Sequence, residues 1–318
     1  MINWGILGAG KIALRFAKSL ESEPNSRLTA VSCRTQAKAD AFAAEHGNCK
    51  AYAGHEKLLA DPSIDAIYLA LPHGLHHEWA IKALTSGKAV LCEKPAALSA
   101  DQVKEMIHTA SHSHRLFMEA MKPRFVPLYG HLKKLLSEGC IGELRSVEAS
   151  LCNQVPPQYI AHSYHTQPIQ GGCLLDCGIY CASWLEDLMD GEVAVRQVSS
   201  SITSDIDYYV HADLTIGGRP ALLECAFDRQ KPRQAIIRGT EGHIVVDDLH
   251  RPQSMTICPD GRESQTIRMP YVVDDFYGEI CHFVRCLQEG IPESPIMSFG
   301  ASIRCAHILD CIRENIPG

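Results

Sequence analysis

The sequence lacks the features that mark several classes of protein. No apolar run approaches the ~20 residues of a transmembrane helix, so we expect no membrane partner. Basic charge is not in excess: the formal net charge is -7, which argues against nucleic acid or an anionic membrane as the main partner. The chain begins on a strand-like run rather than a signal peptide, and it has no internal repeat or low-complexity linker. We therefore expect a cytoplasmic globular protein.

The chain also lacks any C-x-x-C pair, although it contains 14 cysteines. Without an export signal, these are expected to be reduced thiols rather than a disulfide framework. Cys173, Cys177 and Cys181 recur at every fourth position and could share one face of a helix. A metal or cluster site is conceivable there, but a free cysteine is usually a small buried hydrophobe. We expect no metal site.

Length and composition are those of a globular protein with about two domains. The chain has 318 residues, of which 46% are hydrophobic and 21% charged. Apolar strand-like runs alternate with helix-like segments through the first third, and the expected strands are residues 2–7, 28–33, 51–53, 66–70, 89–92 and 116–118. Continuous apolar strands separated by helices predict a doubly wound parallel Rossmann sheet, with its ligand at the C-terminal ends of the strands. We assign residues 1–121 to this dinucleotide-binding domain.

The pattern changes after residue 121. Strand-like segments now follow each other closely, at residues 143–153, 193–201, 208–216, 221–227, 234–239, 243–246 and 254–257. Helices are expected at residues 128–137, 174–189, 276–289 and 299–315. Short gaps with Gly, Pro and Asp predict antiparallel pairing. Residues 122–318 are therefore expected to form an α+β domain for substrate binding and oligomerisation, built on a large open, mainly antiparallel sheet.

The first motif joins the first strand to the first helix. Its sequence is Gly8-Ala9-Gly10-Lys11-Ile12-Ala13. Gly8 permits a tight turn, Gly10 lets the backbone approach a pyrophosphate, and Ala13 lets the helix pack close to the strand. The anion would sit at the helix N-terminus, where free N–H groups and the helix dipole favour it. The motif predicts a dinucleotide site that includes Lys11 and Ile12, and the alternative is a purely structural turn.

The end of the second strand bears on the choice of cofactor. An NAD site usually places Asp or Glu there, whereas this chain has Ser32-Cys33-Arg34-Thr35. Arg34 could stack on adenine and pair with a 2′-phosphate, and Ser32 or Thr35 could donate hydrogen bonds to that phosphate. The alternative is that Arg34 is a solvated surface residue. The pattern favours NADP over NAD.

The fourth and fifth strands end in further candidates. Leu71, Pro72, His73 and His76 follow the fourth strand, and we expect them to line the cofactor rather than hold a metal, because no carboxylate or cysteine accompanies them at ligand spacing. The fifth strand ends in Glu93-Lys94-Pro95. An ammonium near a nicotinamide can polarise a substrate oxygen and lower the pKa of a neighbouring acid. The alternative for Lys94 is a surface lysine.

The third motif lies in the second half, where Gly171-Gly172 leads into a helix. On that helix Asp176 and Tyr180 are four residues apart and share a face. A carboxylate and a phenol on one face suit a substrate that bears hydroxyl groups, because Asp176 could accept a hydrogen bond while Tyr180 exchanges a proton. The alternative is a helix with a capped acid and a half-buried tyrosine.

Together these motifs resemble the glucose–fructose oxidoreductase, inositol dehydrogenase and rhizopine catabolism (Gfo/Idh/MocA) family. The resemblance rests on Gly8 to Ala13, Glu93-Lys94-Pro95, Gly171 to Tyr180, and the turn Gly239-Thr240-Glu241-Gly242. Tyr180, with Met118-Glu119-Ala120 and Arg124-Phe125, is most similar to the branch of dihydrodiol dehydrogenase, D-xylose dehydrogenase (NADP) and glucose–fructose oxidoreductase. The chain departs from the family at His73, where asparagine is common.

The resemblance implies an oxidoreductase that transfers a hydride between nicotinamide and a carbinol or carbonyl carbon of a sugar, polyol or cyclic dihydrodiol. Tyr180, Lys94 and Asp176 would be its catalytic residues, and the open sheet would mediate a homodimer or higher oligomer. Residues 155–170 should line the substrate pocket. Within this loop, His162, Tyr164 and His165 are candidate substrate contacts, and the alternative is that they are exposed loop residues. Arg124, outside the loop, is a further candidate. The alternatives are a non-catalytic dinucleotide and sugar sensor, and a redox-assisted hydrolase with tightly bound NAD.

Overall fold

The computed structural model describes residues 1–160 and 163–317, which form two compact units. The first unit comprises Met1–Ala97, Asp101–Met121 and Val272–Ser302. The second comprises Leu98–Ala100, Lys122–Tyr271 and the residues from Ile303 onward. The segment Val272–Ser302 thus packs in the first unit although it follows the strands of the second. The division into domains 1–121 and 122–318 stays a prediction.

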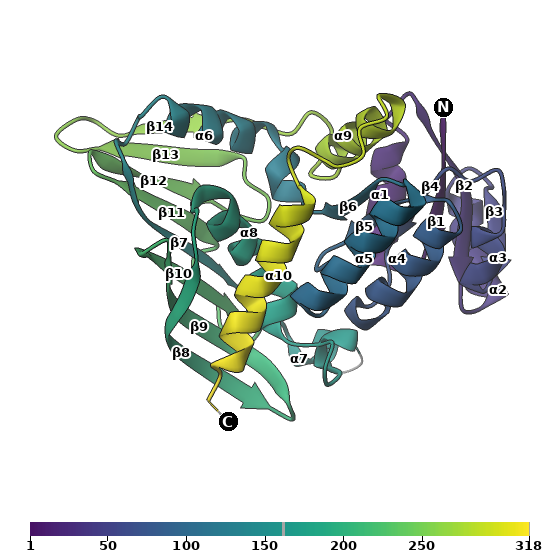
Figure 1. Ribbon diagram of the computed structural model, residues 1–318, viewed down its shortest axis with the longest axis horizontal. Helices are drawn as coiled ribbons and strands as arrows, with labels where there is room; N and C mark the ends of the chain where they lie inside the picture. The colour runs from purple at the N-terminus through teal and green to yellow at the C-terminus, as the bar shows by residue number, and fades with distance from the viewer. Residues whose placement is uncertain (161–162, 318) are drawn as a thin grey trace. The chain divides into compact units, whose positions relative to one another are not determined.

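The first unit is built on a six-stranded parallel sheet (Figure 1). Its strands are β1 (Ile2–Leu7), β2 (Ser26–Cys33), β3 (Lys50–Ala53), β4 (Ala66–Leu69), β5 (Ala89–Glu93) and β6 (Phe117–Ala120). They are ordered β3-β2-β1-β4-β5-β6, and each neighbouring pair is parallel. Strands β4 and β5 are buried along their whole length, as continuous apolar runs require. The predicted doubly wound Rossmann sheet is confirmed.

Helices follow the strands of this sheet. They are α1 (Lys11–Leu20), α2 (Gln36–Glu45), α3 (His55–Leu59), α4 (His76–Thr85) and α5 (Ala100–Ser113), with α9 (Tyr277–Gln288) from later in the chain. Aromatic rings fill the space between α1, α9 and the sheet: Phe16 stacks on Tyr68 and Trp4 contacts Phe283. The Ser19 hydroxyl also donates a hydrogen bond to Asp274, 2.8 Å away. These contacts explain why the segment around α9 belongs to the first unit.

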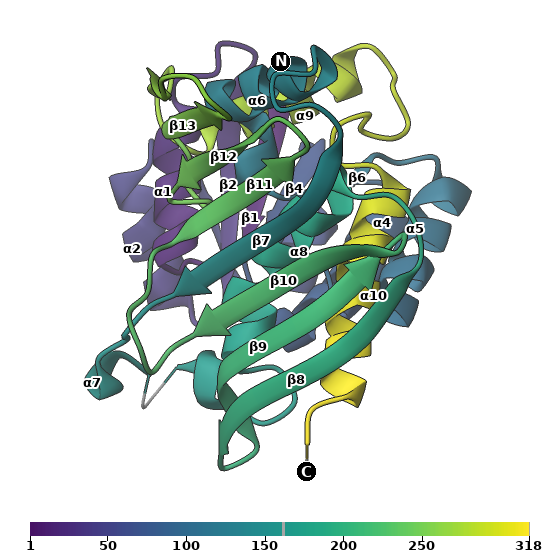
Figure 2. The same cartoon turned by 90° about the vertical axis from the view of Figure 1, so that its left-hand side faces the viewer.

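The second unit is built on an eight-stranded sheet, seen face-on in Figure 2. Its strands are β7 (Leu144–Cys152), β8 (Val193–Thr203), β9 (Ile206–Ile216), β10 (Arg219–Ala226), β11 (Gln234–Gly239), β12 (Gly242–Asp247), β13 (Ser254–Pro259) and β14 (Gln265–Arg268). They are ordered β14-β13-β12-β11-β7-β10-β9-β8. Only the β7–β10 pair is parallel among these neighbours, so the predicted large, mainly antiparallel sheet is confirmed.

The two faces of this sheet differ in burial. Val147 and Ala149 of β7 are fully buried on the face that packs against helix α8 (Ile179–Leu188). Glu148 and Ser150, which alternate with them, are half-buried on the opposite face. The other helices are α6 (Pro127–Ser137), α7 (Pro157–Ile160) and α10 (Phe299–Glu314). The alternation explains how one sheet can carry a helix on one side and present polar side chains on the other.

Two global features bear on the class of protein. All 14 cysteines are free thiols. In the described parts of the chain, no helix is both long enough and apolar enough to span a bilayer.

Candidate functional site

The turn between β1 and α1 has the geometry of an anion cradle. Gly8 has φ +97°, and the Cβ of any other residue there would collide with the carbonyl oxygen of Ala70. Gly10 is the N-cap residue of α1 and makes no side-chain cap, so no side chain of its own satisfies the first N–H groups of that helix. A Cβ on Gly10 would meet nothing within 4 Å. This open space before a helix N-terminus fits the pyrophosphate of a dinucleotide.

The residues after β2 divide into a buried and an exposed group. Ser32 is fully buried, and its hydroxyl lies 2.7 Å from Nδ1 of His55 on α3. A contact between Ser32 and a 2′-phosphate would require the side chain to leave that bond. Arg34 and Thr35 are exposed at the start of α2. They are therefore the better placed candidates for the phosphate of NADP.

His76 joins the loops that follow β4 and β5. It is fully buried at the start of α4, its Nδ1 lies 2.8 Å from the carbonyl oxygen of Pro95, and its Nε2 lies 2.7 Å from that of Leu71. Burial lowers the pKa of His76, while the two carbonyl oxygens act in the opposite direction. His73, in the preceding 3₁₀ turn η1 (His73–Leu75), is 2% exposed. His76 thus connects the loops after β4 and β5, at the edge of the sheet where the cofactor is expected to bind.

Hydrogen bonds to buried carboxylates fix the backbone around Glu93-Lys94-Pro95. Glu93 accepts hydrogen bonds from the Tyr68 hydroxyl and from the backbone N–H of Lys94. Glu119 of β6 accepts one from the N–H of Ala96, 2.9 Å away. Glu93 is 5% exposed, whereas Lys94 is half-buried. Glu93 therefore fixes the backbone from which the Lys94 ammonium projects.

In the second unit, the Gly171–Gly172 turn leaves room for the Asp207 carboxylate at the start of the following helical segment. A Cβ on Gly171 would collide with the carbonyl oxygen of His165, and one on Gly172, where φ is +101°, would collide with the Asp207 carboxylate. Because that space is free, Asp207 Oδ2 accepts the backbone N–H of Leu174 at 2.6 Å. This bond caps η4 (Leu174–Gly178), a π-helical segment that continues into α8. Such segments occur often at functional sites.

Asp176 and Tyr180 lie on this continuous helical segment. Asp176 is in η4 with its side chain 24% exposed, and Tyr180 is in the first turn of α8 and 6% exposed. Each has a histidine beside it: His165, a candidate from the loop 155–170, and His250, which the sequence analysis did not indicate. His165 Nε2 lies 3.7 Å from Asp176 Oδ2, and the His250 ring packs edge-on against Tyr180 with centroids 5.5 Å apart. His250 has no sequence signal that separates it from other loop histidines.

The candidate substrate contacts have different surroundings. Arg124 is buried: its Nε donates to the Ser183 hydroxyl at 2.8 Å and its Nη2 to Glu186 at 2.5 Å. These bonds tie the 3₁₀ turn η2 (Lys122–Phe125) to α8, which is a structural task, so a substrate contact by Arg124 stays a prediction. Tyr164 is half-buried and stacks on His165. His162 lies outside the described residues.

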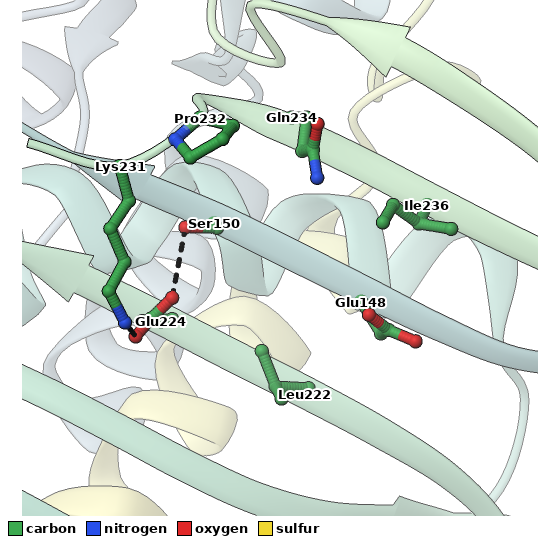
Figure 3. Close-up of a pocket in the computed structure, with 8 residues that line it drawn as sticks. All are labelled: Glu148, Ser150, Leu222, Glu224, Lys231, Pro232, Gln234 and Ile236. Carbon is green, nitrogen blue, oxygen red and sulfur yellow. Dashed lines mark hydrogen bonds and ion pairs between the residues drawn. The ribbon is translucent and has the colours of Figure 1, made fainter.

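A hollow on the other face of the sheet carries charge. Figure 3 shows it between β7, β10 and β11, with Lys231 and Ser150 reaching Glu224. Tyr209 also donates to Glu224, at 2.9 Å. Burial would raise the pKa of Glu224, but hydrogen bonds led by Lys231 hold it below its ordinary value. Because α8 packs against the opposite face of this sheet, the hollow is separate from Tyr180.

Sequence comparison connects this geometry to known proteins. Residues 2–121 match the model of the Gfo/Idh/MocA oxidoreductase family with its NAD-binding Rossmann fold, and residues 129–245 match the Gfo/Idh/MocA C-terminal domain. Trans-1,2-dihydrobenzene-1,2-diol dehydrogenase of Xenopus tropicalis is 33% identical over 96% of both chains. scyllo-Inositol 2-dehydrogenase (NADP(+)) of Bacillus subtilis is also 33% identical, over 99% of this chain and 97% of its own.

Solved structures share the fold across nearly the whole chain. KijD10, a 3-ketoreductase from Actinomadura kijaniata in complex with NADP and TDP-benzene, has a TM-score of 0.89 and 26% identity, covering 99% of this chain and 98% of its own. Levoglucosan dehydrogenase in complex with NADH and levoglucosan has a TM-score of 0.86 at 22% identity, covering 99% and 96%. The second similarity concerns the fold alone.

Proposed function

The chain belongs to the Gfo/Idh/MocA family of NAD(P)-dependent oxidoreductases, and on that premise we propose that it transfers a hydride between NADP and a carbon atom of a sugar, polyol or cyclic dihydrodiol. The observation that carries the proposal is that Asp176 and Tyr180 lie on one capped helical segment. The same chain has Lys94 directly after β5. The relatives named above act on a dihydrodiol and on an inositol, which supports a substrate with neighbouring hydroxyl groups.

The first unit would hold the cofactor. Gly8, Gly10, Lys11, Ile12 and Ala13 would surround the pyrophosphate at the N-terminus of α1. When bound, the nicotinamide supplies or accepts the hydride. Further contacts would come from the loops after β4 and β5, through Leu71, Pro72, His73, His76, Glu93 and Lys94.

The preference for NADP is supported by charge. Arg34 and Thr35 are exposed where an NAD enzyme would usually place a carboxylate. A guanidinium can pair with the 2′-phosphate in two hydrogen bonds, and a carboxylate would repel it. The 33% identical inositol dehydrogenase is named for NADP, which agrees with this preference.

Three side chains would act on the substrate. Tyr180 would exchange a proton with the oxygen of the reacting carbon, which is general acid–base catalysis and typically contributes ~10²–10⁴-fold. The Lys94 ammonium would orient and polarise that oxygen and stabilise the tyrosinate. Asp176 would accept a hydrogen bond from a neighbouring hydroxyl. Because the titrations of a tyrosine and a lysine acting on one oxygen are coupled, the proton donor could also be Lys94.

A cofactor titration followed by a substrate panel tests this proposal. NADPH and NADH are titrated by fluorescence, and turnover of scyllo-inositol, D-xylose, D-glucose and trans-1,2-dihydrobenzene-1,2-diol is followed at the nicotinamide absorbance band. We expect NADPH to bind at least about 10-fold more tightly and at least one compound to be oxidised with stoichiometric reduction of free cofactor. Binding of both dinucleotides without net cofactor reduction by any of the four would contradict the proposal.

The open face of the second unit's sheet would form a homodimer or larger oligomer. Its polar residues, among them the half-buried Glu148 and Ser150 and the buried Glu224, are suited to a partly polar interface that retains water. Light scattering coupled to size-exclusion chromatography measures the mass directly. A monomeric mass at micromolar concentration would exclude this assembly.

A further inference from the structure

The loop that follows β12 packs along the face of α8 that carries Tyr180. Tyr180 and Trp184 are four residues apart on α8 and therefore share a face. The indole Nε1 of Trp184 donates to the carbonyl oxygen of Leu249, 2.9 Å away, and the N–H of Leu249 donates to the carbonyl oxygen of Arg233 at 3.0 Å. Leu249 is itself fully buried. The loop is thus fixed on both sides, and the next residue, His250, is placed against the Tyr180 ring.

The hydrogen bonds of His250 determine which ring nitrogen carries the proton. Its Nδ1 lies 2.7 Å from Oδ1 of Asp248, whose other oxygen bonds Nη2 of Arg233 at 2.8 Å. Although burial opposes ionisation, the bond to His250 and the nearby cations hold the pKa of Asp248 below its ordinary value. Asp248 is therefore a carboxylate that only accepts, so Nδ1 of His250 must donate to it.

The surroundings of His250 favour its neutral form. Burial lowers its pKa, the cations Arg251 and Lys122 act in the same direction, and only Asp248 opposes them. With the proton on Nδ1, the lone pair of the neutral ring resides on Nε2. Nε2 has no hydrogen-bond partner among the residues that the structure describes, and it is not a buried atom. The side chain is 15% exposed. A fixed and accessible acceptor thus stands beside Tyr180.

We propose that His250, oriented by Asp248, recognises a substrate hydroxyl other than the one oxidised and the one bound by Asp176, by accepting its hydrogen bond at Nε2. The inference rests on the proposed function, because it requires that Tyr180 contact the substrate. Sugars and inositols offer such a third hydroxyl, whereas trans-1,2-dihydrobenzene-1,2-diol has only two. His250 and Asp248 would therefore determine the selectivity for polyols over simple diols.

The test measures binding rather than turnover. Dissociation constants of scyllo-inositol, D-xylose, D-glucose and the dihydrodiol are measured by calorimetry in the NADPH complex, where an alcohol cannot be oxidised. His250→Phe keeps a ring against Tyr180 but removes the acceptor, and Asp248→Asn disturbs its protonation. His243→Phe, on β12, is the matched control. For the polyol that binds best, we expect His250→Phe to raise Kd at least about 10-fold, Asp248→Asn to raise it less, and the control to leave it unchanged.

The dihydrodiol distinguishes the outcomes. The Kd of the dihydrodiol should change less than about twofold in His250→Phe, because this compound has no third hydroxyl that His250 could bind. Equal losses for polyol and diol would show a general effect on folding and overturn the inference, as would no loss for either. A wild-type protein that oxidises none of the panel compounds contradicts the proposed function instead, so the two failures are distinguishable.

A pH series provides a second readout. Protonation of Nε2 destroys the acceptor, so polyol binding by the wild-type protein should weaken at low pH. Because the pKa of His250 is lowered, this change should lie below pH 6.5, the ordinary pKa of histidine. The charged and titratable groups around the ring are Asp248, Arg251, Lys122 and Tyr180. In His250→Phe this acidic limb should disappear. A loss of polyol affinity at low pH that persists unchanged in the variant would assign the titration to another group and contradict the inference.

Discussion

The imidazole of His76 lies 2.8 Å from the carbonyl oxygen of Pro95 and thereby holds the backbone next to Lys94. Its other nitrogen approaches the carbonyl oxygen of Leu71 in the same way, so one fully buried ring joins two loops at the ligand-binding edge of the first sheet. A neutral ring donates to only one of these oxygens, so His76→Ala would leave one buried carbonyl oxygen without its donor, at about 1–3 kcal/mol. We expect a clearly lower Tm and a lower kcat/KM. An unchanged Tm in thermal unfolding would show that this connection between the loops is dispensable.

The two glycines of the β1–α1 turn should respond differently to alanine. At Gly8 the φ of +97° and the collision with Ala70 predict a loss of stability of more than about 1 kcal/mol. At Gly10, with φ -88° and open space around the Cβ, folding should be normal. The added methyl group would instead occupy the pyrophosphate position, so NADPH affinity should fall at least about 10-fold. Calorimetric unfolding and fluorescence titration of both variants separate the two effects. Full NADPH affinity in Gly10→Ala would argue against the cradle.

Arg34 should control the preference between the two dinucleotides. Arg34→Ala removes a charge-assisted contact with the 2′-phosphate, which corresponds to roughly a 10–100-fold loss in NADPH affinity. NADH lacks that phosphate, so its affinity should stay within about twofold. Lys38→Ala, which removes an exposed cation on the nearby helix α2, serves as the control. Equal effects of Arg34→Ala on both dinucleotides would refute the assignment.

His282 should make stability depend on pH. Burial lowers its pKa to about 4, and the positive charge of Arg285 acts in the same direction. In the neutral ring Arg285 donates to Nδ1, and Nε2 donates to the Ser294 hydroxyl. Between pH 6.5 and 4 the unfolded chain binds a proton that the folded protein does not. The contribution of neutral His282 to the free energy of unfolding is therefore complete above pH 6.5, and it is lost as the pH falls through about 4. The loss is at most roughly 3 kcal/mol. Urea unfolding across this range should show a slope that His282→Gln removes and that His108→Gln, an exposed control on α5, retains.

Much of the fold could be predicted from local sequence patterns. The strands of the first sheet are buried on both faces, so their continuous apolar runs and the glycine turn at Gly8 are visible without any tertiary information. The antiparallel strands of the second sheet alternate in burial, which the sequence also displays. Strand β14 was missed because its four residues are mostly exposed and polar at the sheet edge. The pattern also gave no sign that the helix carrying Asp176 begins as a π-helical segment.

The candidate site was less predictable because partners distant in sequence decide where polar side chains point. Ser32 or Thr35 could donate to a phosphate, and the sequence does not indicate that the Ser32 hydroxyl lies 2.7 Å from His55, 23 residues later. No motif indicates that Ser183 and Glu186 bind the guanidinium of Arg124, and a substrate contact by Arg124 stays a prediction. Conversely, His250 has no motif around it, and only the fixed loop beside α8 reveals its position. Motifs identify residues at the ends of strands, whereas tertiary contacts determine the direction of their side chains.

The most direct test of the account is the rate of hydride transfer in Tyr180→Phe and Lys94→Ala, measured at the nicotinamide absorbance band with the best substrate of the panel. Both variants should lose at least ~10² in kcat/KM, because each removes a group that acts on the reacting oxygen. NADPH affinity should stay near the wild-type value in the same preparations, which separates catalysis from folding. Wild-type turnover in either variant would contradict the central claim that Tyr180 and Lys94 carry the proton chemistry of this oxidoreductase.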